Sequence, residues 1–223
     1  MGAMVRFDSN GGTTEGYLAR PAEGTPPERG VVVIQEWWGL VDHIKQVADR
    51  LSADGFLALA PDLYHGVVTR SPDEAGKLLM ALNIAQAEKD LRGAVTHVRG
   101  LTERRVGTVG FCMGGALSLF AACANPEDIG ACVVYYGGHP KVACDFDRLN
   151  APVLGHWAEH DDFANPNAAR IESALKQRGL RYEFHRYPGT QHAFFNDTRP
   201  EVYDGAAAQQ SWERTVAFLS SNL

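Results

Sequence analysis

A cysteine stands between two glycines, each two residues away, in residues 109–115, VGFCMGG. The pattern Gly-x-Cys-x-Gly has the spacing of a nucleophile elbow, with Cys112 where many hydrolases carry serine. Such a turn from strand to helix forces residues two positions apart into close approach, which Gly110 and Gly114 tolerate because they lack a Cβ. It also places the sulfur at a helix N-terminus, which favours the thiolate. We predict that Cys112 is a nucleophile; a buried structural cysteine is the alternative.

A general base is expected among the histidines that follow Cys112, because this type of site has the chain order nucleophile, acid, histidine. His192 follows the last predicted strand and precedes the last predicted helix, where an active-site loop belongs. His156 and His185 lie inside predicted strands, and His139 precedes the position of the acid. The sequence therefore favours His192 as the base, with a surface or core histidine as the alternative.

The acid is expected in residues 158–163, AEHDDF, directly after the predicted strand 153–157. Its role would be to accept a hydrogen bond from one imidazole nitrogen, which fixes the tautomer and favours the charged ring. Spacing from the strand favours Asp161, while Asp162 and Glu159 remain alternatives.

A metal site is not predicted. His156 and His160 are four residues apart with Asp161 beside them, but that spacing gathers ligands only on a helix. This segment has the pattern of a strand followed by a turn.

A second carboxylate, Glu36, ends the first predicted central strand within residues 34–40, IQEWWGL. A buried carboxylate is costly unless it is paired or used, so Glu36 is a candidate second base beside Cys112. Pairing of Glu36 with backbone N–H groups or an arginine is the alternative. The backbone N–H groups of Trp37 and Met113 are the expected oxyanion donors. Trp38 either lines a substrate pocket or belongs to the core.

Short apolar runs alternate with helical patterns along the chain, which predicts an α/β fold with a mostly parallel sheet and helices on both faces. No linker or repeat divides the chain, so residues 1–223 are expected to form a single domain. A weakly alternating run at 13–19 suggests an antiparallel edge strand, and residues 62–105 leave room for a small flap with two helices. The predicted central strands are 31–36, 55–60, 106–111, 131–136, 153–157 and 182–187, and the helical patterns fall at 44–51, 91–98, 171–175 and 212–219.

The composition narrows the function classes. The formal net charge of the 223 residues is -6, without a basic cluster, which argues against nucleic acids and anionic membrane surfaces as partners. We expect no membrane span and no secretory signal, and the four cysteines lack a CxxC spacing, so a cytoplasmic location is expected. The oligomeric state is not predicted.

Six motifs in order, from about residue 30 to the C-terminus, resemble the dienelactone hydrolase (carboxymethylenebutenolidase) family of α/β-hydrolases: VVVIQEWWGL, LAPDLYHG, VGFCMGG, VVYYGG, AEHDDF and GTQHAF. The resemblance implies an esterase-type enzyme with a small lactone or ester substrate and no cofactor. It also implies a catalytic triad of Cys112, Asp161 and His192, with Glu36 near the thiol, oxyanion N–H groups from Trp37 and Met113, and Tyr136 facing the pocket.

The sequence departs from this family at Asn196, four residues after His192, where members carry an arginine that binds the substrate carboxylate and pairs with the strand-end glutamate. We therefore expect Asn196 to contact substrate through a neutral hydrogen bond, and Glu36 to lack its partner. Neutral lactones or aryl esters should then be better substrates than anionic dienelactones. A non-catalytic small-molecule binding protein of the same fold is the alternative function.

Overall fold

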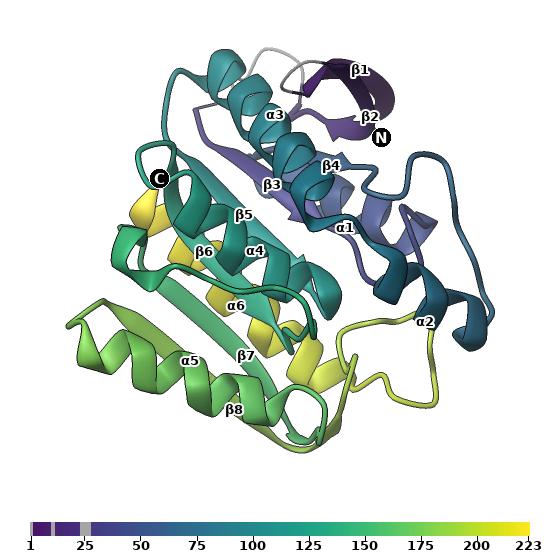
Figure 1. Ribbon diagram of the computed structural model, residues 1–223, viewed down its shortest axis with the longest axis vertical. Coiled ribbons are helices and arrows are strands. Elements are labelled where there is room, and N and C mark those ends of the chain that lie inside the picture. Colours follow the sequence, from purple (N-terminus) through teal and green to yellow (C-terminus); the bar gives the residue numbers. More distant parts are fainter. Residues whose placement is uncertain (1, 10–11, 23–27) are drawn as a thin grey trace.

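Eight strands form one sheet in the order β1-β2-β4-β3-β5-β6-β7-β8 in the computed structural model, which describes residues 2–9, 12–22 and 28–223 (Figure 1). Strands β4, β3, β5, β6, β7 and β8 are mutually parallel. Strand β2 pairs antiparallel with both of its neighbours, β1 and β4. The strands are β1 (Ala3–Ser9), β2 (Gly12–Ala19), β3 (Gly30–Ile34), β4 (Leu57–Pro61), β5 (Val106–Phe111), β6 (Ile129–Tyr135), β7 (Val153–His160) and β8 (Tyr182–Gln191).

The prediction of an edge strand at 13–19 is wrong in one respect. These residues form β2, which is antiparallel as expected, but β1 pairs along its outer side from Ala3 to Ser9. The sequence of β1 gave little signal, because only Phe7 and Ser9 of its seven residues are buried. The six predicted central strands are all present.

Helices cover both faces of the sheet. Figure 1 shows α3, α4 and α5 in front of it and α6 behind it, and α1 lies beside α6, where Trp212 donates a hydrogen bond of 2.9 Å to Asp54. The helices are α1 (Asp42–Ala53), α2 (Pro72–Ala81), α3 (Ile84–Thr102), α4 (Met113–Ala124), α5 (Asn165–Gln177) and α6 (Gly205–Asn222), with a short 3₁₀ turn η1 (Phe146–Arg148). The predicted α/β fold with helices on both faces is confirmed.

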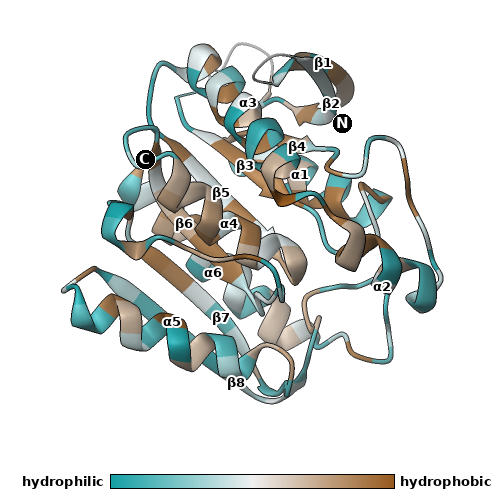
Figure 2. Cartoon of the chain, in the orientation of Figure 1, coloured by the Kyte–Doolittle hydropathy of each residue, from teal (hydrophilic) through white to brown (hydrophobic). Residues whose placement is uncertain are grey.

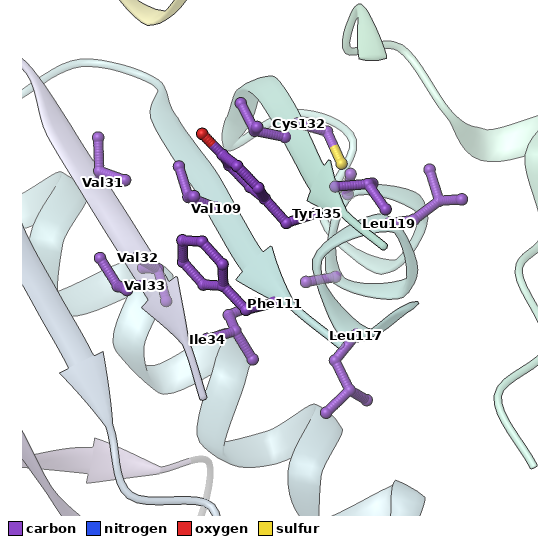
Figure 3. Close-up of a cluster of buried hydrophobic side chains, with 14 of the residues drawn as sticks. Val31, Val32, Val33, Ile34, Val109, Phe111, Leu117, Leu119, Cys132 and Tyr135 are labelled. Carbon is purple, nitrogen blue, oxygen red and sulfur yellow. The ribbon is translucent and has the colours of Figure 1, made fainter. Parts of the chain in front are cut away.

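The core lies on both sides of the central strands. Every residue of β3, β4, β5 and β6 is buried, as parallel strands sandwiched between helices require. Brown, hydrophobic residues predominate along β3, β5 and β6 in Figure 2, whereas hydrophobic and hydrophilic residues alternate along α5. Figure 3 shows part of this core, in which the rings of Phe111 and Tyr135 stack with their centroids 4.6 Å apart.

The carboxyl ends of the parallel strands carry the predicted site. Cys112, Tyr136, Asp161 and His192 each come directly after the last residue of β5, β6, β7 and β8, and Glu36 comes two residues after β3. Parallel strands end at the same edge of a sheet, so side chains from distant parts of the sequence converge there. In the described part of the chain, none of the helices has the length and apolarity needed to cross a membrane.

Candidate active site

The turn from β5 into α4 holds Cys112 in a strained conformation, with φ of 54° and ψ of -117°. The neighbouring glycines explain how the turn closes. A Cβ on Gly110 would overlap the carbonyl oxygen of Gly114, so a side chain at position 110 would open the turn. Backbone strain of this kind, about 1–3 kcal/mol, persists only where the surrounding structure enforces it. The predicted Gly-x-Cys-x-Gly turn is present, with the cysteine at the N-terminus of a buried helix.

The same turn packs α4 against the end of β3. A Cβ on Gly114 would overlap the carbonyl oxygens of Ile34 and Gln35, the residues that lead to Trp37. Met113 is the first residue of α4, and such a residue has no acceptor within its own helix for its N–H. The close packing joins the start of α4 to the segment that leads to Trp37. An oxyanion hole formed by the N–H groups of Trp37 and Met113 stays a prediction.

His192 and Asp161 meet across the ends of β8 and β7. Nδ1 of His192 lies 2.6 Å from Oδ2 of Asp161. The second carboxylate oxygen of Asp161 accepts hydrogen bonds from the backbone N–H groups of Phe163 at 3.2 Å and Ala164 at 2.8 Å. Asp161 is buried, so these bonds fix its orientation and leave one oxygen for the imidazole.

The two alternative acids lie elsewhere. Asp162 is exposed. Glu159 accepts a hydrogen bond of 2.7 Å from the backbone N–H of Gly189, which ties the end of β7 to the segment before His192. Of the three acidic residues in this turn, Asp161 is the one whose carboxylate contacts the imidazole.

The environment of His192 favours its charged form. Burial by itself would lower the pKa of the imidazole, but the neighbouring Cys112 sulfur and the Asp161 carboxylate outweigh it and raise the pKa to about 10. Cys112 acts through its negative charge and through a hydrogen bond to the ring, and Asp161 through the bond to Nδ1. At neutral pH the site therefore holds an imidazolium beside the sulfur.

Glu36 is paired, contrary to the expectation from the sequence. Its Oε2 accepts a hydrogen bond of 2.7 Å from Nδ2 of Asn196, and both side chains are buried. The amide oxygen of Asn196 in turn accepts from the backbone N–H of Thr198 at 3.1 Å and from its hydroxyl at 2.6 Å. In this structure the Asn196 side chain is enclosed and bonded to Glu36 and Thr198, and its contact with substrate stays a prediction.

Tyr136 has a strained backbone, with φ of 38°, and a fully buried side chain. Its hydroxyl has no hydrogen-bond partner among the described residues, and its ring centroid lies 5.0 Å from that of His192. Burial, together with the negative charges of Glu36 and Cys112, raises the pKa of Tyr136 well above its ordinary value. The phenol stays protonated and offers a free O–H donor beside the site.

Three further residues, to which the sequence analysis assigns no role, contact residues of the candidate site. Tyr64 donates a hydrogen bond of 3.3 Å to the sulfur of Met113. Phe163 is 45% exposed, with its ring centroid 5.7 Å from that of His192. The Arg199 guanidinium lies 5.8 Å from the ring centroid of Trp38. Tyr64 and Phe163 stand inside the motifs LAPDLYHG and AEHDDF, which could have identified them; no sequence signal marks Arg199.

The histidines considered as metal ligands are separated. His156 is fully buried, with Nδ1 2.9 Å from the Tyr187 hydroxyl and Nε2 3.0 Å from the Thr215 hydroxyl. His160 is exposed and lies 3.5 Å from Glu159. Within residues 2–9, 12–22 and 28–223, no three His, Cys, Asp or Glu side chains are grouped to hold a metal ion.

Comparisons with known proteins identify the family to which the chain belongs. Residues 14–223 match the model of the "Dienelactone hydrolase family". The chain is 38% identical to "Protein usf" of Aquifex pyrophilus and 33% identical to a "Putative carboxymethylenebutenolidase" of Aquifex aeolicus, with all of both chains covered in each case. A crystal structure titled as a putative dienelactone hydrolase from Klebsiella pneumoniae superposes with a TM-score of 0.84 at 27% identity, covering 98% of this chain and 99% of that one. The chain thus belongs to the dienelactone hydrolase family, and it is a lactone or ester hydrolase with the α/β-hydrolase fold.

Proposed function

We propose that the protein hydrolyses a small lactone or activated ester through a covalent acyl-enzyme on Cys112. The observation that carries the proposal is the contact of 2.6 Å between His192 and Asp161, directly beside a cysteine at a nucleophile elbow. Nucleophile, base and orienting acid are the three parts that covalent acyl transfer needs.

The reaction begins with attack of the Cys112 thiolate on the carbonyl carbon of the substrate. The carbonyl oxygen gains negative charge, which the backbone N–H groups of Trp37 and Met113 stabilise; removing one such donor costs about 10²–10³-fold in rate in other hydrolases. As the intermediate collapses, the C–O bond breaks and His192 gives its proton to the leaving alkoxide.

Water then completes the cycle. Neutral His192 takes a proton from a water molecule, the hydroxide attacks the thioester, and the acid product leaves as the Cys112 thiolate is restored. Asp161 holds the imidazole in one orientation and stabilises its charged form in both halves. We propose that Tyr136 donates its free O–H to the bound substrate. We further propose that the negative charge of Glu36 disfavours anionic substrate groups beside the thiolate.

The substrate we propose is neutral and small. Asn196 is enclosed and bonded to Glu36, so it offers no site for a substrate carboxylate. The Arg199 guanidinium lies 5.8 Å from the ring centroid of Trp38, and its Nε lies 2.9 Å from Glu201, which offsets its charge. The half-buried Trp38 and the exposed Phe163 offer apolar surface instead. The four free cysteines are consistent with the proposed cytoplasmic location.

A screen of small lactones and aryl esters, each neutral compound paired with an analogue that carries a carboxylate, tests this function. We expect turnover with wild type and with Cys132→Ala, a buried thiol outside the site, and its loss in Cys112→Ala. We also expect faster turnover of the neutral member of each pair. If Cys112→Ala binds and turns over these compounds as wild type does, or if both bind without reacting, the cysteine-dependent hydrolase is wrong.

A further inference from the structure

Phe163 carries an exposed aromatic ring beside the candidate base. It lies in the turn between β7 and α5, and its side chain is 45% exposed. Its ring meets the imidazole of His192 edge to face, with the ring centroids 5.7 Å apart and an angle of 82° between the planes. Single exposed aromatic side chains are common on protein surfaces, so exposure alone assigns no role to Phe163. The contacts of the ring do assign one.

The far end of the Phe163 ring lies against the nucleophile turn. A Cβ on Gly138 would stand 2.6 Å from Cε1 and 3.0 Å from Cζ of the ring, so the ring rests directly on this glycine. The backbone N–H of Gly138 donates a hydrogen bond of 3.2 Å to the carbonyl oxygen of Cys112. The ring therefore reaches from the imidazole of His192 to a residue that is hydrogen-bonded to the nucleophile.

The candidate acid holds both the base and this ring. Oδ1 of Asp161 accepts a hydrogen bond of 3.2 Å from the backbone N–H of Phe163, while Oδ2 lies 2.6 Å from Nδ1 of His192. One buried carboxylate thus fixes the imidazole and the residue that carries the ring in a single arrangement. A ring that is already held in place loses little conformational freedom when a ligand packs against its exposed part.

The order of the strands indicates which part of a substrate meets the ring. The predicted oxyanion donors, Trp37 and Met113, follow β3 and β5, whereas Phe163 and His192 follow β7 and β8 on the other side of β6. In the proposed mechanism the departing oxygen takes a proton from His192, so it must come within about 2.6–3.2 Å of the free ring nitrogen. The group attached to that oxygen therefore lies on the β7–β8 side, beside Phe163.

We propose that Phe163 forms the wall of the leaving-group subsite and selects substrates whose departing oxygen carries an aryl group. This inference rests on the proposed acyl-enzyme mechanism and specifies its substrate class. A flat apolar group covers the exposed part of the ring, and two aromatic rings attract each other at centroid distances of about 4.5–7 Å. The contact exists only while the alcohol part is attached, so it favours formation of the thioester and not its hydrolysis.

Three activated esters test the subsite. Phenyl acetate carries an aromatic ring on the departing oxygen, trifluoroethyl phenylacetate carries one on the acyl side, and trifluoroethyl acetate carries none. We expect Phe163→Ala to lower kcat/KM for phenyl acetate by about 10-fold relative to the other two esters. Phe163→Tyr, which keeps the ring, should retain the wild-type ratios. Because each variant is compared with wild type on the same ester, the different intrinsic reactivities of the esters cancel.

Phe218 provides the matched control. It is a half-buried phenylalanine on α6 that lines a groove with Pro152 and Tyr182. These two residues stand at the amino ends of β7 and β8, opposite the edge of the sheet that carries Cys112. Phe218→Ala should therefore leave kcat/KM unchanged for all three esters.

Three outcomes with active wild type would overturn the subsite. An equal fall for all three esters in Phe163→Ala would mean that the ring only supports His192. A fall confined to the phenylacetate would place the acyl part against the ring, and unchanged values for all three would show that the ring does not contact the leaving group. In each case the hydrolase proposal stands. Absence of turnover of every ester by wild type would instead overturn that proposal, and this inference with it.

Discussion

Asn196 and Glu36, 160 residues apart in sequence, are joined by a hydrogen bond of 2.7 Å from the amide Nδ2 to the carboxylate Oε2. The orientation of the amide follows from its other side, because the backbone N–H of Thr198 can only donate and so faces the amide oxygen. A neutral amide therefore pairs with the buried carboxylate of Glu36, for which the sequence predicts no partner.

Replacing that amide by a carboxylate should destabilise the protein strongly. In Asn196→Asp an oxygen faces Oε2 of Glu36, and an uncompensated buried charge costs about 3–5 kcal/mol. The double variant Glu36→Gln/Asn196→Asp restores an amide–carboxylate pair with the donor reversed, so we expect most of the free energy of unfolding to return. Urea unfolding of both single variants and the double variant measures this. Additive losses in the double variant would show that the two side chains do not interact.

The titration of His192 should lie far above its ordinary range. With a pKa of about 10, the imidazolium persists through neutral pH. Because the folded-state pKa is raised, the stability that this charge contributes is fully present below the ordinary pKa of about 6.5 and is lost as the pH rises through about 10. In Cys112→Ala the negative charge and the hydrogen bond from the sulfur are removed, so the midpoint should fall by about 1–3 pH units.

NMR titration of the His192 ring protons in both proteins measures the two midpoints. The ring protons of His185, which lies within β8, serve as the internal control. A wild-type midpoint near 6.5, or one that Cys112→Ala leaves unmoved, would show that sulfur and imidazole do not interact.

The acid can be tested with two adjacent residues. Asp161→Asn weakens the bond to Nδ1 of His192 and allows the wrong tautomer, so we expect kcat to fall by about 10²–10⁴-fold with the fold retained. Asp162→Asn changes an exposed side chain and should leave kcat unchanged. Steady-state kinetics with one aryl ester compares them. A large loss in Asp162→Asn with a silent Asp161→Asn would reverse the assignment.

Two glycine substitutions should have opposite effects on stability. In Gly114→Ala the new methyl group meets the backbone of Ile34 and Gln35, which have no room to move, so we expect a loss of more than about 3 kcal/mol or failure to fold. Gly100 is in α3, and a Cβ there meets no atom within 4 Å, so Gly100→Ala should add about 0.5–1 kcal/mol. Thermal unfolding compares the two. Equal tolerance at both positions would contradict the close packing of the elbow.

The sequence predicted those parts of the site that follow from local pattern. Cys112 is fixed by its own turn, and the order of strands places Asp161 and His192 at neighbouring strand ends, so spacing favours both of them. Spacing alone leaves Asp162 and Glu159 open beside Asp161. Contacts between distant side chains left no such pattern. The bond between Asn196 and Glu36 depends on how the loop after His192 folds back over β3, and the position of Arg199 over Trp38 depends on the same loop.

The edge of the sheet shows the same limit. β1 is recognisable only through its partner β2, because most of its side chains are exposed and its alternation is weak.

The central claim is that Cys112 carries the acyl group during turnover. Wild-type protein mixed with an aryl ester, quenched in acid before the first turnover is complete and analysed by mass spectrometry, tests it most directly. We predict a mass increase equal to the acyl group, located on the peptide that contains Cys112, in step with a burst of released phenol, and absent from Cys112→Ala. Turnover in wild type with the acyl group on another residue, or with unmodified Cys112 at every quench time, would contradict the account.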